Sequence, residues 1–231
     1  MEETPDAAAR RLNAWLANAE PVQILQAALT REHAGRVALV SSFGTESAVL
    51  LHMAAQIDRD APVLFIDTGK LFTKTLQYKE ALVERLGLTN IRVLAPDAED
   101  LRRRDASGEL WSHAPDACCA IRRTAPLARA LDGYNAWVTG RKRFQGGLRR
   151  WLPVVEASKG RIKYNPLARW SAEDVAAYFE AKELPRHPLE ARGFRSVGCW
   201  PCTRPAEDRN DPRSGRWAGS DKTECGIHLS V

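Results

Sequence analysis

The strongest constraint on the fold is an alternation of short apolar runs with helical segments in the first half of the chain. A buried strand is predicted at Val37–Val40, a second ends at Asp67, and a third covers Ile91–Leu94. Between them, apolar residues follow the helical period after Ser47 and again over 73–86. Strands that alternate with helices predict a three-layer α/β fold, with a mainly parallel sheet and helices on both faces.

Fewer regular elements are predicted in the rest of the chain. Thr45 and Ser171 are the expected N-caps of the helices that follow them. From Pro185 onward the chain is rich in Pro, Gly, Arg and Trp, and we expect an irregular C-terminal segment. The other expected elements are helices at 6–34, 117–131 and 171–181, a fourth strand at 136–139, and short apolar stretches at 152–155 and 161–164.

The turn after the first strand is a candidate anion site. In parallel sheets ligands bind beyond the carboxyl ends of the strands, and backbone N–H groups at a helix N-terminus favour anions. The turn offers several hydroxyl donors but lacks the lysine and the glycine spacing of a Walker loop. An anion site and an ordinary capped turn are therefore both open on this motif, which reads Ser41-Ser42-Phe43-Gly44-Thr45-Glu46-Ser47.

Charge is divided unevenly along the 231 residues, whose net charge is +5. Residues 1–100 hold 10 basic and 14 acidic side chains, a balance of −4, whereas residues 101–231 hold 24 and 15, a balance of +9. A basic half favours an anionic partner such as a nucleotide, sulfate or nucleic acid. A solvated basic surface is the alternative for any single arginine, but arginines cluster with glycine and aromatic residues at 141–150 and 213–217.

Four of the five cysteines form two close pairs, Cys118 with Cys119 and Cys199 with Cys202. Four thiolates suit either zinc or an iron–sulfur cluster, and the adjacent Cys-Cys pair departs from the spaced pairs of common zinc sites. The alternative is a small buried pair on a helix together with a separate redox pair.

The fifth cysteine, Cys225, has no partner once the two pairs are assigned. A thiol is a nucleophile only as the thiolate, and nearby cations lower its pKa. Lys222, His228 and the arginines of the run at 213–217 are candidate cations. An incidental surface cysteine near the terminus is the alternative.

No apolar stretch is long enough to span a membrane, and the acidic N-terminal start has no apolar core of a secretory signal. We therefore expect a cytoplasmic protein with no membrane partner. In a reducing compartment, metal binding or catalysis explains cysteines better than a disulfide framework does.

At these motifs the sequence resembles the sulfonucleotide reductase family, and within it the assimilatory adenylyl-sulfate reductases. The resemblance runs from about Val37 to His228, and the order of Cys-Cys, Cys-x-x-Cys and Glu-Cys-Gly-Ile-His is specific to it. Its motifs are SSFGTES (41–47), the DTG turn (67–69), CCAIRRTAPL (118–127), TGRKRFQ (139–145), IKYNPLARW (162–170), GFRSVGCWPCTRP (193–205) and ECGIH (224–228).

The resemblance implies an adenine-nucleotide α-hydrolase-like fold and an enzyme that reduces adenosine 5′-phosphosulfate to sulfite and AMP in sulfate assimilation. Cys225 would attack the sulfur and carry it as S-sulfocysteine, and thioredoxin or glutaredoxin would release sulfite. Because nothing in this sequence follows Val231, the reductant is expected to be a separate protein. One [4Fe–4S] cluster would be held by Cys118, Cys119, Cys199 and Cys202.

The family also implies a division of the chain and a substrate site. Residues 1–203 would form the nucleotide-binding domain with the cluster, and 204–231 a mobile tail that carries Cys225. A homo-oligomer is expected. The substrate residues would be Ser41, Ser42, Phe43, Gly44, Thr45, Glu46, Ser47, Asp67, Thr68, Gly69, Arg123, Gly140, Arg141, Arg143, Arg149, Arg213, Arg216 and His228.

Two departures from the family pattern bear on the site. The Arg-Lys pair that usually follows Cys-Cys is Arg122-Arg123 here, so a planar guanidinium replaces a point ammonium. Gly146 stands where the family has serine after Gln145.

Within the family the rival substrate is the 3′-phosphorylated nucleotide. The two cysteine pairs argue against an enzyme restricted to that substrate, whereas dual specificity stays open. A zinc-stabilised nucleic-acid-binding module would not need Cys225, so no nucleic-acid partner is expected.

Overall fold

The computed structural model describes residues 3–208, 211–217, 220 and 222–228. A six-stranded sheet forms its centre, in the order β3-β2-β1-β4-β6-β5. The predicted α/β architecture and its four early strands are confirmed. The strands are β1 (Val37–Ser41), β2 (Val63–Ile66), β3 (Ile91–Leu94), β4 (Ala136–Thr139), β5 (Val155–Ser158) and β6 (Arg161–Tyr164).

All neighbouring strands are parallel except β5 and β6, which form an antiparallel hairpin at one edge. The chain order places β1 between β2 and β4, so the direction of winding changes there. Leu39 of β1 faces Val63 of β2 on one side and Val138 of β4 on the other. Such a switch point opens a crevice at the carboxyl ends of the strands, where ligands bind.

Successive residues of the central strands enter different cores, as the two-residue period of a strand requires. Val37 and Leu39 of β1 belong to one buried cluster, with residues from α1 to α4 and α9. Ala38, between them, belongs to the other cluster, with Leu127 of α8 and Ile227 near the C-terminus. The second face of the sheet is therefore covered by α8 and by the C-terminal segment.

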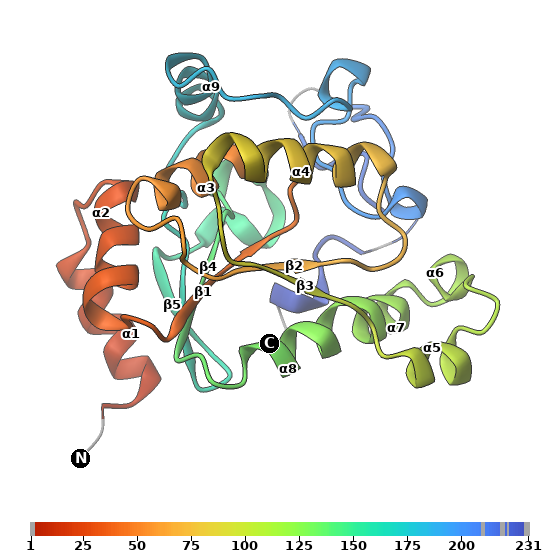
Figure 1. Ribbon diagram of the computed structural model, residues 1–231, viewed down its shortest axis with the longest axis horizontal. Coiled ribbons are helices and arrows are strands. Elements are labelled where there is room, and N and C mark those ends of the chain that lie inside the picture. Colours follow the sequence, from red (N-terminus) through yellow and green to blue (C-terminus); the bar gives the residue numbers. More distant parts are fainter. Residues whose placement is uncertain (1–2, 209–210, 218–219, 221, 229–231) are drawn as a thin grey trace.

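Figure 1 shows α3, α4 and α9 on one side of the sheet and α7 and α8 on the other, while α1 packs beside β5. The protein has no described helix that is both long and apolar enough to cross a membrane. The helices are α1 (Pro5–Trp15), α2 (Pro21–Gln26), α3 (Ser47–Ala55), α4 (Thr73–Leu86), α5 (Ala98–Arg104), α6 (Leu110–His113), α7 (Pro115–Cys119), α8 (Ala125–Leu131) and α9 (Ala172–Ala181).

The single helix predicted at 6–34 is wrong, because α1 ends at Trp15 and α2 starts at Pro21. Proline has no backbone N–H to continue a helix but fits its first turn. The helix predicted at 117–131 exists as α7 and α8, joined by a π-helical stretch at Ala120–Thr124. Pro126 lacks the N–H that a regular α-helix would use at that position.

The two predicted N-caps have different outcomes. Ser171 caps α9, because its hydroxyl accepts a hydrogen bond from the Asp174 amide at 3.1 Å while Asp174 bonds back to the Ser171 amide. The Thr45 prediction is wrong: α3 starts at Ser47, and the Thr45 hydroxyl donates instead to the carbonyl of Arg195 at 2.8 Å.

The segment after Pro185 is irregular as predicted, and its described residues form short 3-10 turns and two isolated bridges, Leu71–Cys199 and Thr203–Arg216. It nevertheless packs on the body of the protein. The Arg204 amide bonds to Gly215 and the Trp217 amide to Cys202, and the side chains of Trp217 and Ile227 are buried in the second core. Residues 209–210, 218–219, 221 and 229–231 of the predicted 204–231 tail lie outside the described residues.

We expect Ser171→Ala to lower the free energy of unfolding by about 1 kcal/mol, because the first turn of α9 loses its acceptor. Urea-induced unfolding followed by circular dichroism measures this change. Ser171→Asp is the matched control, since its carboxylate retains an acceptor at the same place. Equal unfolding midpoints for the wild type and the alanine variant would contradict the capping role.

Candidate active site

A cleft of about 160 Å³ lies at the carboxyl ends of β1 and β4. The turn after β1, the segment after β4 and the C-terminal segment all contribute to its walls. These parts are far apart in sequence, so the fold brings most of the predicted substrate residues together. The predicted residues on the wall are Ser41, Ser42, Gly44, Thr45, Glu46, Ser47, Arg123, Gly140, Arg141, Arg149, Arg213, Arg216, Cys225 and His228.

Phe43 and Arg143 lie outside the cleft. The Phe43 side chain is fully buried and packs edge-on against Phe65, with ring centroids 5.4 Å apart. Its backbone has φ of 48°, a left-handed conformation that is uncommon for a bulky residue. Arg143 donates from Nε to the carbonyl of Leu152 at 2.8 Å. The structure therefore gives Phe43 a packing role and Arg143 a loop-bracing role.

Glu46 is the anionic member of the turn after β1. Its Oε2 atom lies 2.9 Å from Nζ of Lys142 and 2.9 Å from Nε2 of Gln145. Lys142 is almost fully buried and also donates to the Gly140 carbonyl at 2.9 Å. The Lys142 charge is therefore compensated within the protein, and Glu46 connects the first turn to the segment after β4.

Arg141 is a buried cation that is also paired. It forms an ion pair with Glu156 and donates to Oδ1 of Asn165 at 3.1 Å. Burial lowers the pKa of Arg141 from its usual value, and burial and then the Arg141 charge lower the pKa of nearby Lys163 to about 8. Several cations thus gather beneath this side of the cleft.

The Cys225 thiol lies beside a guanidinium on the cleft wall. Its Sγ atom is 3.4 Å from Nη1 of Arg123, and only 4 % of the residue is exposed. A hydrogen bond with Cys119 and then the Arg123 charge lower the pKa of Cys225 well below its usual value, although burial opposes them. A guanidinium in contact with sulfur favours the thiolate, which is the nucleophilic form.

Arg216 is a half-buried cation that lacks a carboxylate partner among the described residues. Its guanidinium stacks over the Trp217 ring at 4.4 Å, and Nη1 lies 3.4 Å from Oγ of Ser196. A Cβ atom at Gly198 would clash with Nη2 of Arg216, so a side chain there would displace the guanidinium. The absence of a side chain at Gly198 makes room for Arg216.

His228 reaches the cleft, but as a neutral ring. Burial and the charges of nearby cations, with Arg141 and Arg149 first, lower the pKa of His228 well below its usual value. The imidazole lies parallel to Trp137, with centroids 6.3 Å apart. The expectation that His228 supplies positive charge is therefore wrong, because burial and then the surrounding cations disfavour the protonated ring. Its imidazole can still form hydrogen bonds.

Several nitrogens in this region are buried and have no hydrogen-bond partner within the described ranges. They are Nε of Arg123, Nε of Arg216 and Nδ1 of His228. Buried polar groups are usually satisfied, so such atoms at a cleft point to a polar ligand. The cleft therefore suits an anion with several acceptor oxygens.

A second cavity contains all four paired cysteines, Cys118, Cys119, Cys199 and Cys202. It shares three wall residues with the cleft, namely Arg123, Arg216 and Trp217. Within the described part of the chain, no three His, Cys, Asp or Glu side chains are grouped as they would be around a single bare ion. The cysteines instead surround a common space behind the cleft.

The residues of this second cavity fit a group bound by thiolates. Burial raises the pKa of Cys118 to about 11 and also raises that of Cys202, and a bound metal would offset this effect because its charge favours the thiolate. The guanidinium of Arg123 stands on its wall and can balance part of the charge of the thiolates, whereas Arg122 is paired with the buried carboxylate of Asp105 at 2.6 Å. The donor set is all sulfur, as in iron–sulfur sites.

The DTG turn lies at this cysteine cavity and not at the cleft. The Thr68 hydroxyl is 3.2 Å from Sγ of Cys199, and the Thr68 carbonyl accepts from Arg122 at 2.8 Å. Asp67 accepts from the Gly69 amide at 2.9 Å and so stabilises the turn itself. Ile66, just before the turn, is the residue of this strand end that reaches the cleft.

Some polar residues of the cleft were not among the predicted site residues, and Lys142, Gln145 and Glu224 are the ones whose charge or contacts shape the site. Lys142 and Gln145 lie within the same basic run as the predicted arginines, and Glu224 immediately precedes Cys225. Their charge and position were visible in the sequence. Their pairing was not visible, because Lys142 and Gln145 contact Glu46, and Glu224 contacts Arg149, across long stretches of sequence.

Comparisons with known proteins identify the family of this chain. The family model of the phosphoadenosine phosphosulfate reductase domain matches residues 36–205. A relative from Mesorhizobium japonicum named adenosine 5′-phosphosulfate reductase is 50% identical, over 97% of this chain and 88% of its own. A relative from Gloeobacter violaceus named phosphoadenosine 5′-phosphosulfate reductase is 41% identical, over 84% of this chain and 82% of its own.

Among solved structures, the chain is similar to the phosphoadenylyl-sulfate (PAPS) reductase of Candida auris in its phosphate complex. The TM-score is 0.73 at 26% identity, and the match covers 85% of this chain and 96% of that chain. Fold, motif order and family match agree over most of the sequence. The chain belongs to the phosphoadenosine phosphosulfate reductase domain family.

Proposed function

We propose that this protein is an adenylyl-sulfate reductase that converts adenosine 5′-phosphosulfate to sulfite and AMP in sulfate assimilation. The observation that carries the proposal is the Cys225 thiol, held 3.4 Å from Arg123 on the wall of a cleft lined by arginines. A lone activated thiol inside an anion site fits a displacement at the sulfur of an anionic nucleotide.

The substrate would be bound mainly through charge. Arg123 and Arg216 have unpaired nitrogens at the cleft, and the turn after β1 adds hydroxyl donors from Ser41 to Ser47. Planar guanidiniums bind phosphate and sulfate oxygens in bidentate fashion. Because these donors are already in place, they also stabilise the charge that develops on the leaving phosphate oxygen.

In the first step the Cys225 thiolate attacks the sulfur, and the bond from that sulfur to the bridging phosphate oxygen breaks. AMP leaves with the electron pair, and Cys225 carries the sulfonate group. In the second step one thiolate of a thioredoxin or glutaredoxin dithiol attacks Sγ of Cys225, and sulfite leaves. The second thiol of the reductant resolves the mixed disulfide, so the dithiol supplies both electrons and Cys225 returns to the thiolate.

Delivery of Cys225 to a protein reductant requires movement, because the residue is only 4 % exposed where it lies. We therefore propose that residues 1–203 act as the nucleotide-binding body and 204–231 as a mobile tail. The tail would pack over the cleft for the first step and open for the second. A dithiol reductant and free cysteines also fit a cytoplasmic location.

We further propose that Cys118, Cys119, Cys199 and Cys202 hold a [4Fe–4S] cluster. When bound, the cluster would supply a charged inorganic centre behind the shared wall. Arg123 would lie between that centre and Cys225, since it lines both cavities. Its guanidinium would orient the substrate and keep Cys225 ionised.

The decisive measurement of the reaction is sulfite release from adenosine 5′-phosphosulfate and from its 3′-phosphorylated form in parallel, with thioredoxin present. We expect faster release from the first substrate. Faster release from the second would support the rival specificity that the relative from Gloeobacter violaceus suggests. Cys225→Ser is the control: it should bind the nucleotide and release no sulfite, and normal turnover by it would refute the nucleophile.

A second prediction concerns Arg216. Loss of a charge-assisted hydrogen bond in Arg216→Ala should cost about 1.5–3 kcal/mol, which corresponds to a roughly 10- to 150-fold loss in kcat/KM. Arg102→Ala is the matched control, because Arg102 is exposed on α5 and pairs with Glu99 outside the cleft. Equal kcat/KM for the wild type and Arg216→Ala would remove Arg216 from the site.

The cluster proposal predicts a brown protein when the chain is purified without oxygen. Iron and acid-labile sulfide should be present in equal amounts, and Cys202→Ser should lose both. Iron and sulfide are measured chemically, and zinc by mass spectrometry. One zinc per chain without iron would contradict the proposal.

A further inference from the structure

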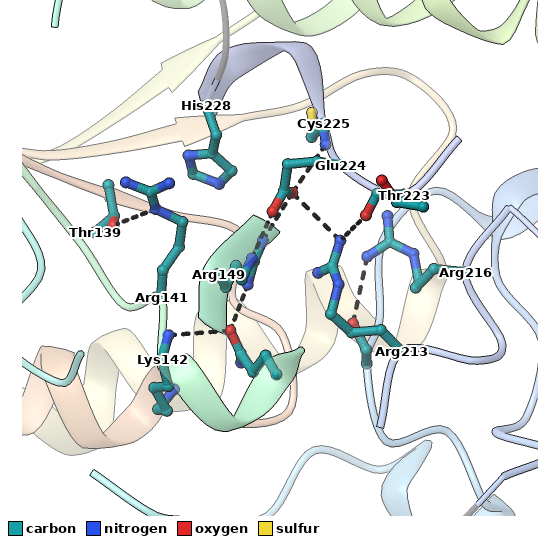
Figure 2. Close-up of polar contacts among 12 residues, drawn as sticks. Thr139, Arg141, Lys142, Arg149, Arg213, Arg216, Thr223, Glu224, Cys225 and His228 are labelled. Carbon is teal, nitrogen blue, oxygen red and sulfur yellow. Dashed lines mark hydrogen bonds and ion pairs between the residues drawn. The ribbon is translucent and has the colours of Figure 1, made fainter. Parts of the chain in front are cut away.

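A carboxylate stands among the cations of the cleft. Glu224 is buried, and its Oε2 atom lies 2.5 Å from Nε of Arg149 while Oε1 lies 2.8 Å from Nη2. Oε1 also lies 3.3 Å from Nη2 of Arg213 and accepts from the Cys225 amide at 2.9 Å. Figure 2 shows this carboxylate at the centre of the contacts, with Arg149 and Arg213 on different sides.

Glu224 has the same sign of charge as the proposed substrate. Burial alone favours the neutral acid, but hydrogen bonds and charge from Arg149, followed by Arg213, lower the pKa of Glu224 to about 2. The group is therefore ionised throughout the neutral range. A carboxylate inside an anion-binding cleft weakens the binding of an anionic ligand. A second role for Glu224, in holding the structure of the site, would compensate for this loss of affinity.

The arginines of the cleft fall into two groups. Arg149 uses Nε and Nη2 for Glu224 and Nη1 for Gln145, so its fork is fully engaged within the protein. Arg213 uses Nη2 for Glu224 and for the Thr223 carbonyl at 3.0 Å. Arg123 and Arg216, in contrast, have no carboxylate at ion-pair distance in the described ranges and keep an unpaired Nε.

The contacts of Glu224 join distant parts of the chain. Arg149 comes from the segment after β4, whereas Arg213 and Glu224 come from the C-terminal segment. Through Gln145 the chain of polar contacts continues to Glu46 in the turn after β1. Because Glu224 also accepts from the amide of Cys225, the position of the nucleophile is tied to this ion pair.

We propose that Glu224 is a positioning residue, which with Arg149 and Arg213 forms a latch that holds the C-terminal segment over the cleft and sets the place of Cys225. The inference rests on the proposed role of Cys225 as nucleophile. The guanidiniums of Arg123 and Arg216 then remain available to bind the substrate. A bidentate arginine–carboxylate pair suits a latch, because it is directional yet can separate when the tail opens.

The latch is tested on the protein without substrate, by alkylation of Cys225 with iodoacetamide. Mass spectrometry follows the tryptic peptide that begins after Lys222. We expect Glu224→Gln to raise the Cys225 rate by about tenfold or more, since it removes the charge of a strong bidentate pair. Rates are compared on the alkaline plateau of the pH profile, where a change in thiol pKa has no effect.

Arg149→Lys is the second variant, because an ammonium keeps the charge but cannot engage both carboxylate oxygens and Gln145 together. Arg149→Lys should also raise the alkylation rate of Cys225. The double variant should raise this rate by less than the product of the two single effects. Asp132→Asn is the matched control, since it breaks the ion pair with Arg161 at the opposite end of β6. Its alkylation rate should equal that of the wild type.

Kinetics separate a latch from a general loss of structure. In Glu224→Gln, kcat should fall while KM stays equal or decreases, because an anion leaves the site. A raised KM with an unchanged Cys225 alkylation rate would overturn the proposal, as would additive effects of the two variants. If the wild type releases no sulfite but the alkylation results hold, the latch stands and the proposed reaction fails.

Discussion

Buried positive charge at the carboxyl edge of the sheet is the constraint on which the rest of the site depends. An unpaired buried charge is costly, so each cation needs a partner or a ligand. Glu46 compensates Lys142, Glu156 compensates Arg141, and Glu224 compensates Arg149. The described residues provide no such carboxylate for Arg123 and Arg216, and these two guanidiniums form the wall shared by the cleft and the cysteine cavity.

The C-terminal segment belongs both to the site and to the core. Trp217, Cys225 and Ile227 pack with Ala38 and Trp137 on the second face of the sheet. The apolar contacts favour a closed arrangement, and Glu224 adds a directional contact to the same segment. A nucleophile carried on such a segment can lie deep in the protein and still be delivered to another protein, provided that the ion pair can open.

Strands were easier to predict than helices in this chain. β1, β2 and β4 are short, apolar and largely buried, so their composition alone indicates them. β3 lies at the edge of the sheet and is more exposed, and its place in the alternation of strands and helices indicates it. The helix expected at 6–34 is broken before Pro21, and the Thr45 hydroxyl contacts Arg195 instead of capping α3. The first outcome is local, because Pro21 lacks the N–H that continues a helix. The second is not, because the partner of Thr45 lies far along the chain.

By itself the sequence determined the α/β class, the two cysteine pairs, the separate Cys225 and the basic second half, because residue type and spacing carry this information directly. Only the tertiary structure decided what each charged side chain does. It lowered the pKa of His228 by burying the imidazole and placing cations around it. It also packed the Phe43 side chain into the core and placed Glu224 against Arg149. Burial and charge pairing depend on neighbours that are distant in sequence, and only the folded chain brings those neighbours together.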